Sequence, residues 1–179
     1  MDADEPILCP SIDRLCLFPL KHPDTFEWYT KQVESLWTVH EVDLGGDRAD
    51  FETLTEGERA FIMKILSFFA SSDAIVNENL ADNFHGEVQV PEMRLVYGFQ
   101  IGMETIHTHM YNLLIEHYEK SEVAREKLFH AIKHSSTISD KAEWALKWLN
   151  PDRSFAERLV AFACVEGIFF SASYTANGH

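Results

Sequence analysis

The segment "QIGMETIHTHMYNLLIEHY", residues 100–118, carries an acid, an imidazole and a phenol at helical spacing. Glu104 and His107 stand at positions i and i+3, and Tyr111 follows one turn later. At about 100° per residue, the three side chains would fall within a sector of about 60° on one side of a helix. We interpret Glu104 and His107 as candidate metal ligands, because Glu-x-x-His pairs on facing helices hold iron or manganese in helical bundles.

Two further acids interrupt apolar seams elsewhere in the chain. In residues 55–84 an apolar residue recurs at alternating spacings of four and three, and Asp73 is the polar member of that run. Glu166 breaks a similar run between Leu159 and Phe169. An isolated ionised carboxylate in an apolar interior costs many kcal/mol, so such a group is protonated, paired or bound to metal.

No Lys or Arg occupies the same seams, so bound metal is the charge that could neutralise these acids. Each signal taken alone has a plainer explanation. A single acid in a seam can be a rim residue, a Glu-x-x-His pair can be a surface contact, and Tyr111 can be a core tyrosine with a bonded hydroxyl. Taken together, the four candidates favour a metal site over these readings.

Helical periodicity dominates the chain, and no alternating strand pattern or internal repeat is visible. Thr55 and Glu58 form a capping-box signature, and Pro91 suits a first helical turn. We expect residues 41–53 to form a loop broken by two glycines. The predicted helices cover residues 25–37, 55–84, 91–120, 122–134 and 139–149. Pro151 is predicted to start a last helix, with Asp152 or Ser154 close to its cap. These lengths predict an all-α bundle of long antiparallel helices.

Composition narrows the function classes. The chain has 179 residues, 46% of them hydrophobic, and a net charge of −14, which argues against a nucleic-acid partner. Three cysteines form no CxxC pair, and no signal peptide is recognisable, so we expect a cytoplasmic protein. The longest apolar stretch, residues 159–170, is too short for a membrane span and contains Glu166, so we expect no membrane partner.

Three motifs carry a resemblance to a known family: "SSDAIVNENL", "GFQIGMETIHTHMY" and "VAFACVEGIFFS". With them the chain resembles the small subunit of class I ribonucleotide reductase, and "DRLCLFP" and "LWTVHEVDL" resemble its eukaryotic-type branch. The resemblance implies a ferritin-like homodimer with a carboxylate-bridged di-iron centre, for which manganese is an alternative. Such a protein uses oxygen to generate a tyrosyl radical for a large subunit that reduces ribonucleotides.

The resemblance also implies roles for individual residues. Asp73, Glu104 and His107 resemble the ligands of a first iron, and Glu104 should also bridge the two irons. Glu166 resembles a ligand of the second iron.

Three aromatic residues acquire roles in the same way. Tyr111 resembles the radical tyrosine, and Trp37 resembles the tryptophan that links the metal site to the subunit interface. Phe170 resembles part of the apolar wall around the radical.

Near its C-terminal end the chain stops following the family, at about Tyr174, before the second Glu-x-x-His that supplies the remaining ligands. We therefore expect an extended arm over residues 1–24 and a partial ferritin-like di-iron domain over residues 25–179. This chain alone should hold at most one weakly bound metal and no stable radical.

An alternative function is that of a truncated, non-catalytic paralogue or fragment that dimerises with full-length subunits and modulates them. Another di-iron protein, such as an oxidase or iron-storage bundle, is disfavoured by the pairing of Tyr111 with Trp37.

Overall fold

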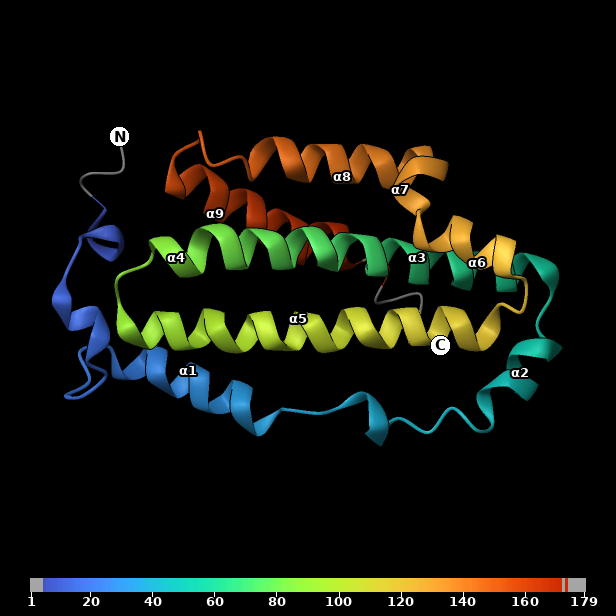
Figure 1. The fold of residues 1–179 in the computed structure, drawn as a ribbon, viewed down its shortest axis with the longest axis horizontal. Coiled ribbons are helices and arrows are strands. Elements are labelled where there is room, and N and C mark those ends of the chain that lie inside the picture. The colour runs from blue at the N-terminus through green and yellow to red at the C-terminus, as the bar shows by residue number, and fades with distance from the viewer. Residues whose placement is uncertain (1–4, 172, 174–179) are drawn as a thin grey trace. The chain divides into compact units, whose positions relative to one another are not determined.

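Helices form nearly all of the regular structure in the computed structural model, which describes residues 5–171 and 173 (Figure 1). The helices are α1 (Pro23–Glu34), α2 (Asp47–Thr53), α3 (Glu56–Asn79), α4 (His85–Glu87), α5 (Pro91–Tyr118), α6 (Glu122–Phe129), α7 (Ala131–His134), α8 (Ser136–Trp148) and α9 (Phe155–Cys164). Short 3-10 helices lie at Pro6–Leu8, Ile12–Leu15 and Val39–Glu41. Two π-helices, η5 (Leu80–Phe84) and η6 (Val165–Phe169), continue α3 and α9. The described residues contain no strand, so the all-α prediction is confirmed.

Local capping explains where two of the core helices begin. The Glu58 carboxylate accepts hydrogen bonds from the backbone N–H and the hydroxyl of Thr55, at 2.8 and 2.7 Å. Ser154 and Glu157 form the same reciprocal arrangement at the start of α9. Both boxes satisfy N–H groups that a helix start otherwise leaves unbonded, which confirms Thr55 and Ser154 as capping residues. Helix α9 itself begins at Phe155 rather than at the predicted Pro151.

Two further predicted boundaries are wrong. Residues 47–53 form α2 rather than loop, because Asp47 and Asp50 place acids in a first turn directly after the glycines. The predicted helix over residues 122–134 is two helices, separated at His130, whose φ of −104° and ψ of 34° are not helical.

The chain divides into two compact units, and the division falls inside α3 and α5. The first unit contains the described residues up to Trp37 together with Val76–Thr105. The second contains Thr38–Ile75 and the described residues from Ile106 onward. The predicted split into an arm over residues 1–24 and one domain over residues 25–179 stays a prediction.

Aromatic contacts and backbone hydrogen bonds hold the first unit together. The rings of Phe84 and Tyr97 stack with centroids 5.7 Å apart, and burial raises the pKa of the Tyr97 phenol. The Arg94 guanidinium donates to the backbone carbonyl oxygens of His85 and Val88. These bonds fasten the turn between α4 and α5.

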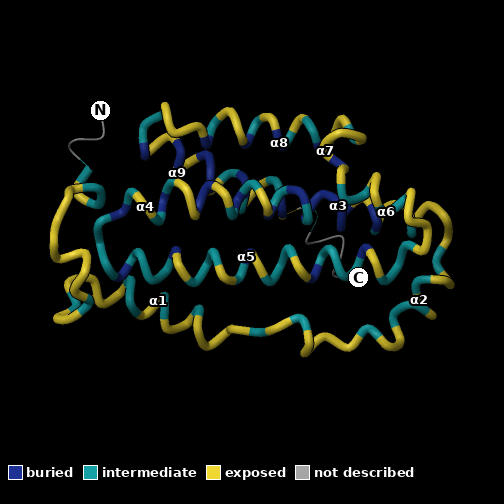
Figure 2. The backbone as a smooth tube through the Cα atoms, viewed as in Figure 1, coloured by how far each residue is buried: buried dark blue, intermediate teal, exposed yellow. Residues whose placement is uncertain are grey.

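In the second unit, α3 and α5 run side by side in opposite directions (Figure 1). Met63 and Leu66 of α3 form a buried cluster with Ile115 of α5, which is fully buried. Buried and exposed residues alternate along α8 and α9 (Figure 2), as expected of helices with one face on a core. The rings of Trp144 and Phe169 contact each other at 5.0 Å and join α8 to η6.

The continuous helical segment Glu56–Glu87 is long and apolar enough, by length and composition alone, to cross a membrane. Half of its most apolar stretch is buried inside the protein. Core helices of soluble proteins can be equally long and apolar.

Glu92, in the first turn of α5, is fully buried and joins two distant parts of the first unit. Its Oε1 atom accepts hydrogen bonds from the backbone N–H groups of Lys21 and His22, at 2.7 and 3.0 Å, directly before α1. A carboxylate in this place lies near the N-terminal ends of two helices, where negative charge is favourable. Burial alone would raise the pKa of Glu92, but these N–H donors outweigh it and lower the pKa below 4.5.

We predict that Glu92→Gln lowers the free energy of unfolding at pH 7 by about 1–3 kcal/mol, because it removes the charge from these buried hydrogen bonds. The lowered pKa means that the carboxylate stabilises the fold above its ordinary value of 4.5 and loses this effect as pH falls through the folded pKa. The gap between wild type and variant should therefore shrink in acid. Urea unfolding followed by circular dichroism at pH 7 and pH 3.5 measures it. Glu78→Gln, at an exposed position of the same unit, is the control. An equal loss in both variants, or a gap independent of pH, would contradict the prediction.

Candidate metal centre

Three of the predicted ligands lie close together. Asp73, Glu104 and His107 each offer one ligand atom, and these atoms all lie within 4.8 Å of one another. Asp73 projects from α3, and the other two project from adjacent turns of α5. The two carboxylate residues are buried, with 1% of Asp73 and 7% of Glu104 exposed, and His107 is half-buried.

Regular helix geometry accounts for this convergence. Phe69 and Val76, one turn on either side of Asp73, are both fully buried, so Asp73 lies in the middle of an apolar seam. Glu104 and His107 share one face of α5, because residues at i and i+3 on a helix are neighbours. Since α3 and α5 are antiparallel neighbours, the two faces meet at these residues.

The donor set fits a transition metal. Two carboxylates and one imidazole are oxygen and nitrogen ligands of the kind that iron and manganese take in helical bundles. Two buried carboxylates next to each other repel unless a proton or a cation lies between them. A divalent cation bound between the two carboxylates would supply the positive charge that relieves this repulsion.

Glu166, the fourth predicted ligand, does not belong to this group of described residues whose ligand atoms lie within 4.8 Å of one another. It is half-buried and belongs to the π-helix η6, whereas the seam argument assumed a regular α-helix. A π-helical turn inserts one residue and re-aims the side chains that follow, and such turns are frequent at functional sites. The role of Glu166 as a metal ligand stays a prediction.

Tyr111 lies one turn beyond His107, and the centroids of the two rings are 6.4 Å apart. The Tyr111 ring stacks on Phe69 at 5.0 Å with an interplanar angle of 13°. Phe170, which is 1% exposed, contacts Phe69 edge to face at 5.6 Å. Phe69 thus contacts both Tyr111 and Phe170, and the role of Phe170 in an apolar wall around Tyr111 stays a prediction.

Trp37 follows α1 and is half-buried in the first compact unit. Its role in moving an electron stays a prediction. Tyr174, where we expect the chain to stop following the family, lies outside the described residues.

Lys141 is a neighbour of this aromatic group that the sequence did not reveal. Its ammonium lies 4.2 Å from the centroid of the Phe68 ring and donates to the carbonyl oxygen of Phe169 at 3.3 Å. Partial burial lowers the pKa of this lysine. The sequence predicted only a helix over residues 139–149, and the rings of Trp144 and Trp148 on this helix lie 6.0 Å apart. Lys141 therefore links α8 to the end of η6. This link could not be predicted from the sequence, because it depends on how the two helices pack.

Known proteins share both the sequence and the fold. Residues 14–177 match the family described as ribonucleotide reductase, small chain. The small subunit of ribonucleoside-diphosphate reductase from Dictyostelium discoideum is 56% identical over 95% of this chain and 51% of its own length. The corresponding small chain from Nicotiana tabacum is 53% identical over 97% of this chain and 53% of its own length. The ribonucleotide reductase Rnr4 homodimer from Saccharomyces cerevisiae superposes with a TM-score of 0.85 at 36% identity, covering 97% of this chain and 55% of that one.

This chain spans about half the length of the curated relatives that it matches. Across that half the agreement is nearly continuous, and the helical architecture is that of a ferritin-like small-subunit bundle. On these grounds the chain belongs to the family of ribonucleotide reductase small chains.

Proposed function

We propose that this chain carries the metal-binding and radical-forming part of a small subunit of ribonucleoside-diphosphate reductase. The observation that supports this most directly is the convergence of Asp73, Glu104 and His107, with Tyr111 one turn further along the same helix. A structural role for the buried acids would not require an imidazole and a phenol on the same face. Membership of the family supports the same reading.

In this proposal Asp73, Glu104 and His107 would hold a first metal ion, and Glu104 and Glu166 would hold a second. Iron is the proposed metal, and manganese is the alternative that the same oxygen and nitrogen donors accept. When bound, the metal pair supplies oxidising equivalents from dioxygen.

Tyr111 is the proposed site of oxidation. Its phenol would give up one electron and its hydroxyl proton to become a neutral phenoxyl radical. Phe69 stacks on the ring and also contacts Phe170, so this face of the ring would be shielded from water and reductants. Trp37 is proposed to help move the electron.

The proposed partners follow from the family. A large subunit would receive the radical and reduce the ribonucleotide. A second small subunit would complete a homodimer, which the similarity to a homodimeric yeast relative supports. A cytoplasmic location is part of the proposal, since deoxyribonucleotides are made for DNA synthesis from soluble precursors.

We predict that Glu104→Ala abolishes metal binding to this chain. A bridging ligand contributes to both ions, and loss of a direct ligand should exceed the roughly 10–100-fold effect of removing a group that only orients a ligand. Anaerobic titration with ferrous iron, followed by metal analysis after gel filtration, measures the change. Glu116→Ala, at an exposed position of the same helix, is the matched control and should retain the metal.

His107→Gln should resemble Glu104→Ala in this titration, because both residues would hold the first ion. Equal iron content in wild type, Glu104→Ala and His107→Gln would remove the metal-site proposal.

We predict that Tyr111→Phe keeps the metal and loses the radical. The test uses a chimera in which residues 1–173 of this chain continue into the second half of the Dictyostelium discoideum relative, because this chain spans half of that protein. After addition of ferrous iron and oxygen, electron paramagnetic resonance should show a tyrosyl signal that Tyr111→Phe removes. Tyr118→Phe is the control, since Tyr118 lies on the same helix but stacks on Phe51. An unchanged signal in Tyr111→Phe would place the radical on another residue.

A further inference from the structure

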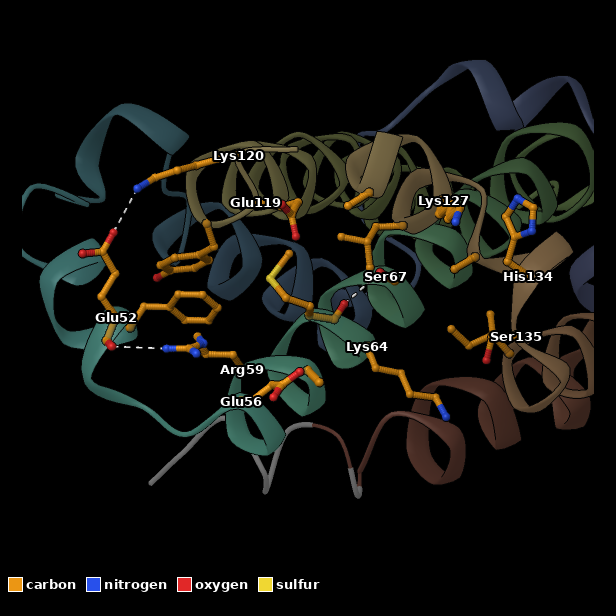
Figure 3. A pocket seen from close by; sticks show the side chains of 18 of the residues that line it. Glu52, Glu56, Arg59, Lys64, Ser67, Glu119, Lys120, Lys127, His134 and Ser135 are labelled. Carbon is orange, nitrogen blue, oxygen red and sulfur yellow. Dashed lines mark hydrogen bonds and ion pairs between the residues drawn. The ribbon is translucent and has the colours of Figure 1, made fainter. Parts of the chain in front are cut away.

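A cavity of about 700 Å³ opens in the second unit, on a side of α3 that the proposed metal chemistry does not use (Figure 3). Met63 and Ser67 of α3 line it, together with residues of α2, α5, α6, α7 and α8. On a helical wheel Ser67 stands about 120° from Asp73, so the cavity and the acid occupy different faces of α3. Its volume is typical of sites that bind small molecules, which run from about 300 to 1,000 Å³.

The floor of the cavity is apolar. It is formed by Phe51, Met63, Tyr118, Leu128 and Ile138. The rings of Phe51 and Tyr118 stack at 4.5 Å and make a flat wall on one side. The Ser67 hydroxyl is already engaged, because it donates to the carbonyl oxygen of Met63 at 2.8 Å. This floor suits a hydrocarbon or aryl group.

Positive charge is concentrated around the rim. The whole chain has 15 Lys and Arg against 29 Asp and Glu. The cavity reverses this balance, since five Lys and Arg but only three Glu line it: Arg48, Arg59, Lys64, Lys120 and Lys127 against Glu52, Glu56 and Glu119. Charges of one sign around a hollow concentrate ligands of the opposite sign. A protein that is acidic overall therefore presents a local site for anions.

Three of the rim cations already have partners within the protein, and two do not. The carboxylate of Glu52 forms ion pairs with Arg48 at 3.7 Å and with Lys120 at 3.1 Å. Arg59 donates to backbone carbonyl oxygens of the α2 segment.

Lys64 and Lys127 form no ion pair with any of the residues that the structure describes. Figure 3 shows both on the side of the cavity away from Glu52, together with Ser135. Two ammonium groups without acidic partners are therefore available to an anion at this end.

We propose that the cavity binds a small amphipathic anion. Its apolar body lies against Phe51, Met63 and Leu128, and its carboxylate or phosphate is held by Lys64 and Lys127. Neither part would suffice alone, because exposed lysines attract anions only weakly and an apolar floor does not distinguish charge. The proposal concerns a site apart from the metal centre and does not depend on the radical chemistry.

Decanoate and decyl phosphate, used below their micelle concentrations, are the probes for the two head groups. Decanol and decyltrimethylammonium are the neutral and cationic counterparts with the same chain. Titration calorimetry measures affinity, and the carbon-13 methyl resonance of Met63, assigned with Met63→Leu, reports whether the probe occupies this cavity. We expect at least one of the two anions to bind, to shift the Met63 resonance and to bind more tightly than the cation. Tighter binding of decanoate identifies a carboxylate site, and tighter binding of decyl phosphate a phosphate site.

The double variant Lys64→Gln/Lys127→Gln should bind the preferred anion about tenfold more weakly, while its affinity for decanol stays unchanged. Lys31→Gln/Lys147→Gln is the matched control, because it makes the same change in net charge at exposed positions that do not line the cavity. All four positions are exposed, so the variants should fold, which circular dichroism checks. Binding of neither anion, an unshifted Met63 resonance, or equal weakening in the two double variants would overturn the proposal.

Discussion

The burial of two carboxylates, Asp73 on α3 and Glu104 on α5, is the constraint on which the candidate metal centre depends. Asp73 and Glu104 interrupt seams that would otherwise be wholly apolar, and an apolar residue at either position would pack at far lower desolvation cost. Burial of Phe69 and Val76, one turn on either side of Asp73, helps to offset that cost. A shift of α3 against α5 by one turn would separate Asp73 from Glu104 and His107. The two buried acids therefore favour the binding of a cation and do not stabilise the core by themselves.

Sequence reasoning located the parts of this site that lie on regular helices. Asp73, Glu104 and His107 could be found because a period of 3.6 residues places them on facing seams. Helix α3 also starts where its capping residue Thr55 predicts. Glu166 and Phe170 are different, since a π-helix precedes or contains them and changes the angle between successive side chains. Nothing in the apolar run of residues 159–170 distinguishes a π-turn from an α-turn. Helix α2 was missed because a seven-residue helix shows too little periodicity to compete with its two preceding glycines.

Features that depend on contacts between distant segments left no local signal. The carboxylate of Glu92 receives N–H groups from residues about seventy positions earlier in the chain. Lys141 donates to a carbonyl oxygen on another helix. The cavity lined by Met63, Lys64 and Lys127 draws its residues from several helices, each of which carries an ordinary solvent-facing pattern. Sequence periodicity describes one element at a time, so sites made by several elements emerge only when the chain is folded.

Helix α3 can carry both a candidate cation site and a proposed anion site, because the charged groups of the two sites are exposed to water to different degrees. The acids that face the metal centre are buried, where the surrounding dielectric is low and salt screens little. Lys64 and Lys127 lie at an open rim, where the Debye length of about 8 Å at physiological salt confines their attraction to the mouth of the cavity. The cations of the rim therefore do little to repel a metal ion on another face of α3. The same screening makes anion capture depend on the apolar floor for most of its affinity, and it leaves the lysines to select the sign of the charge.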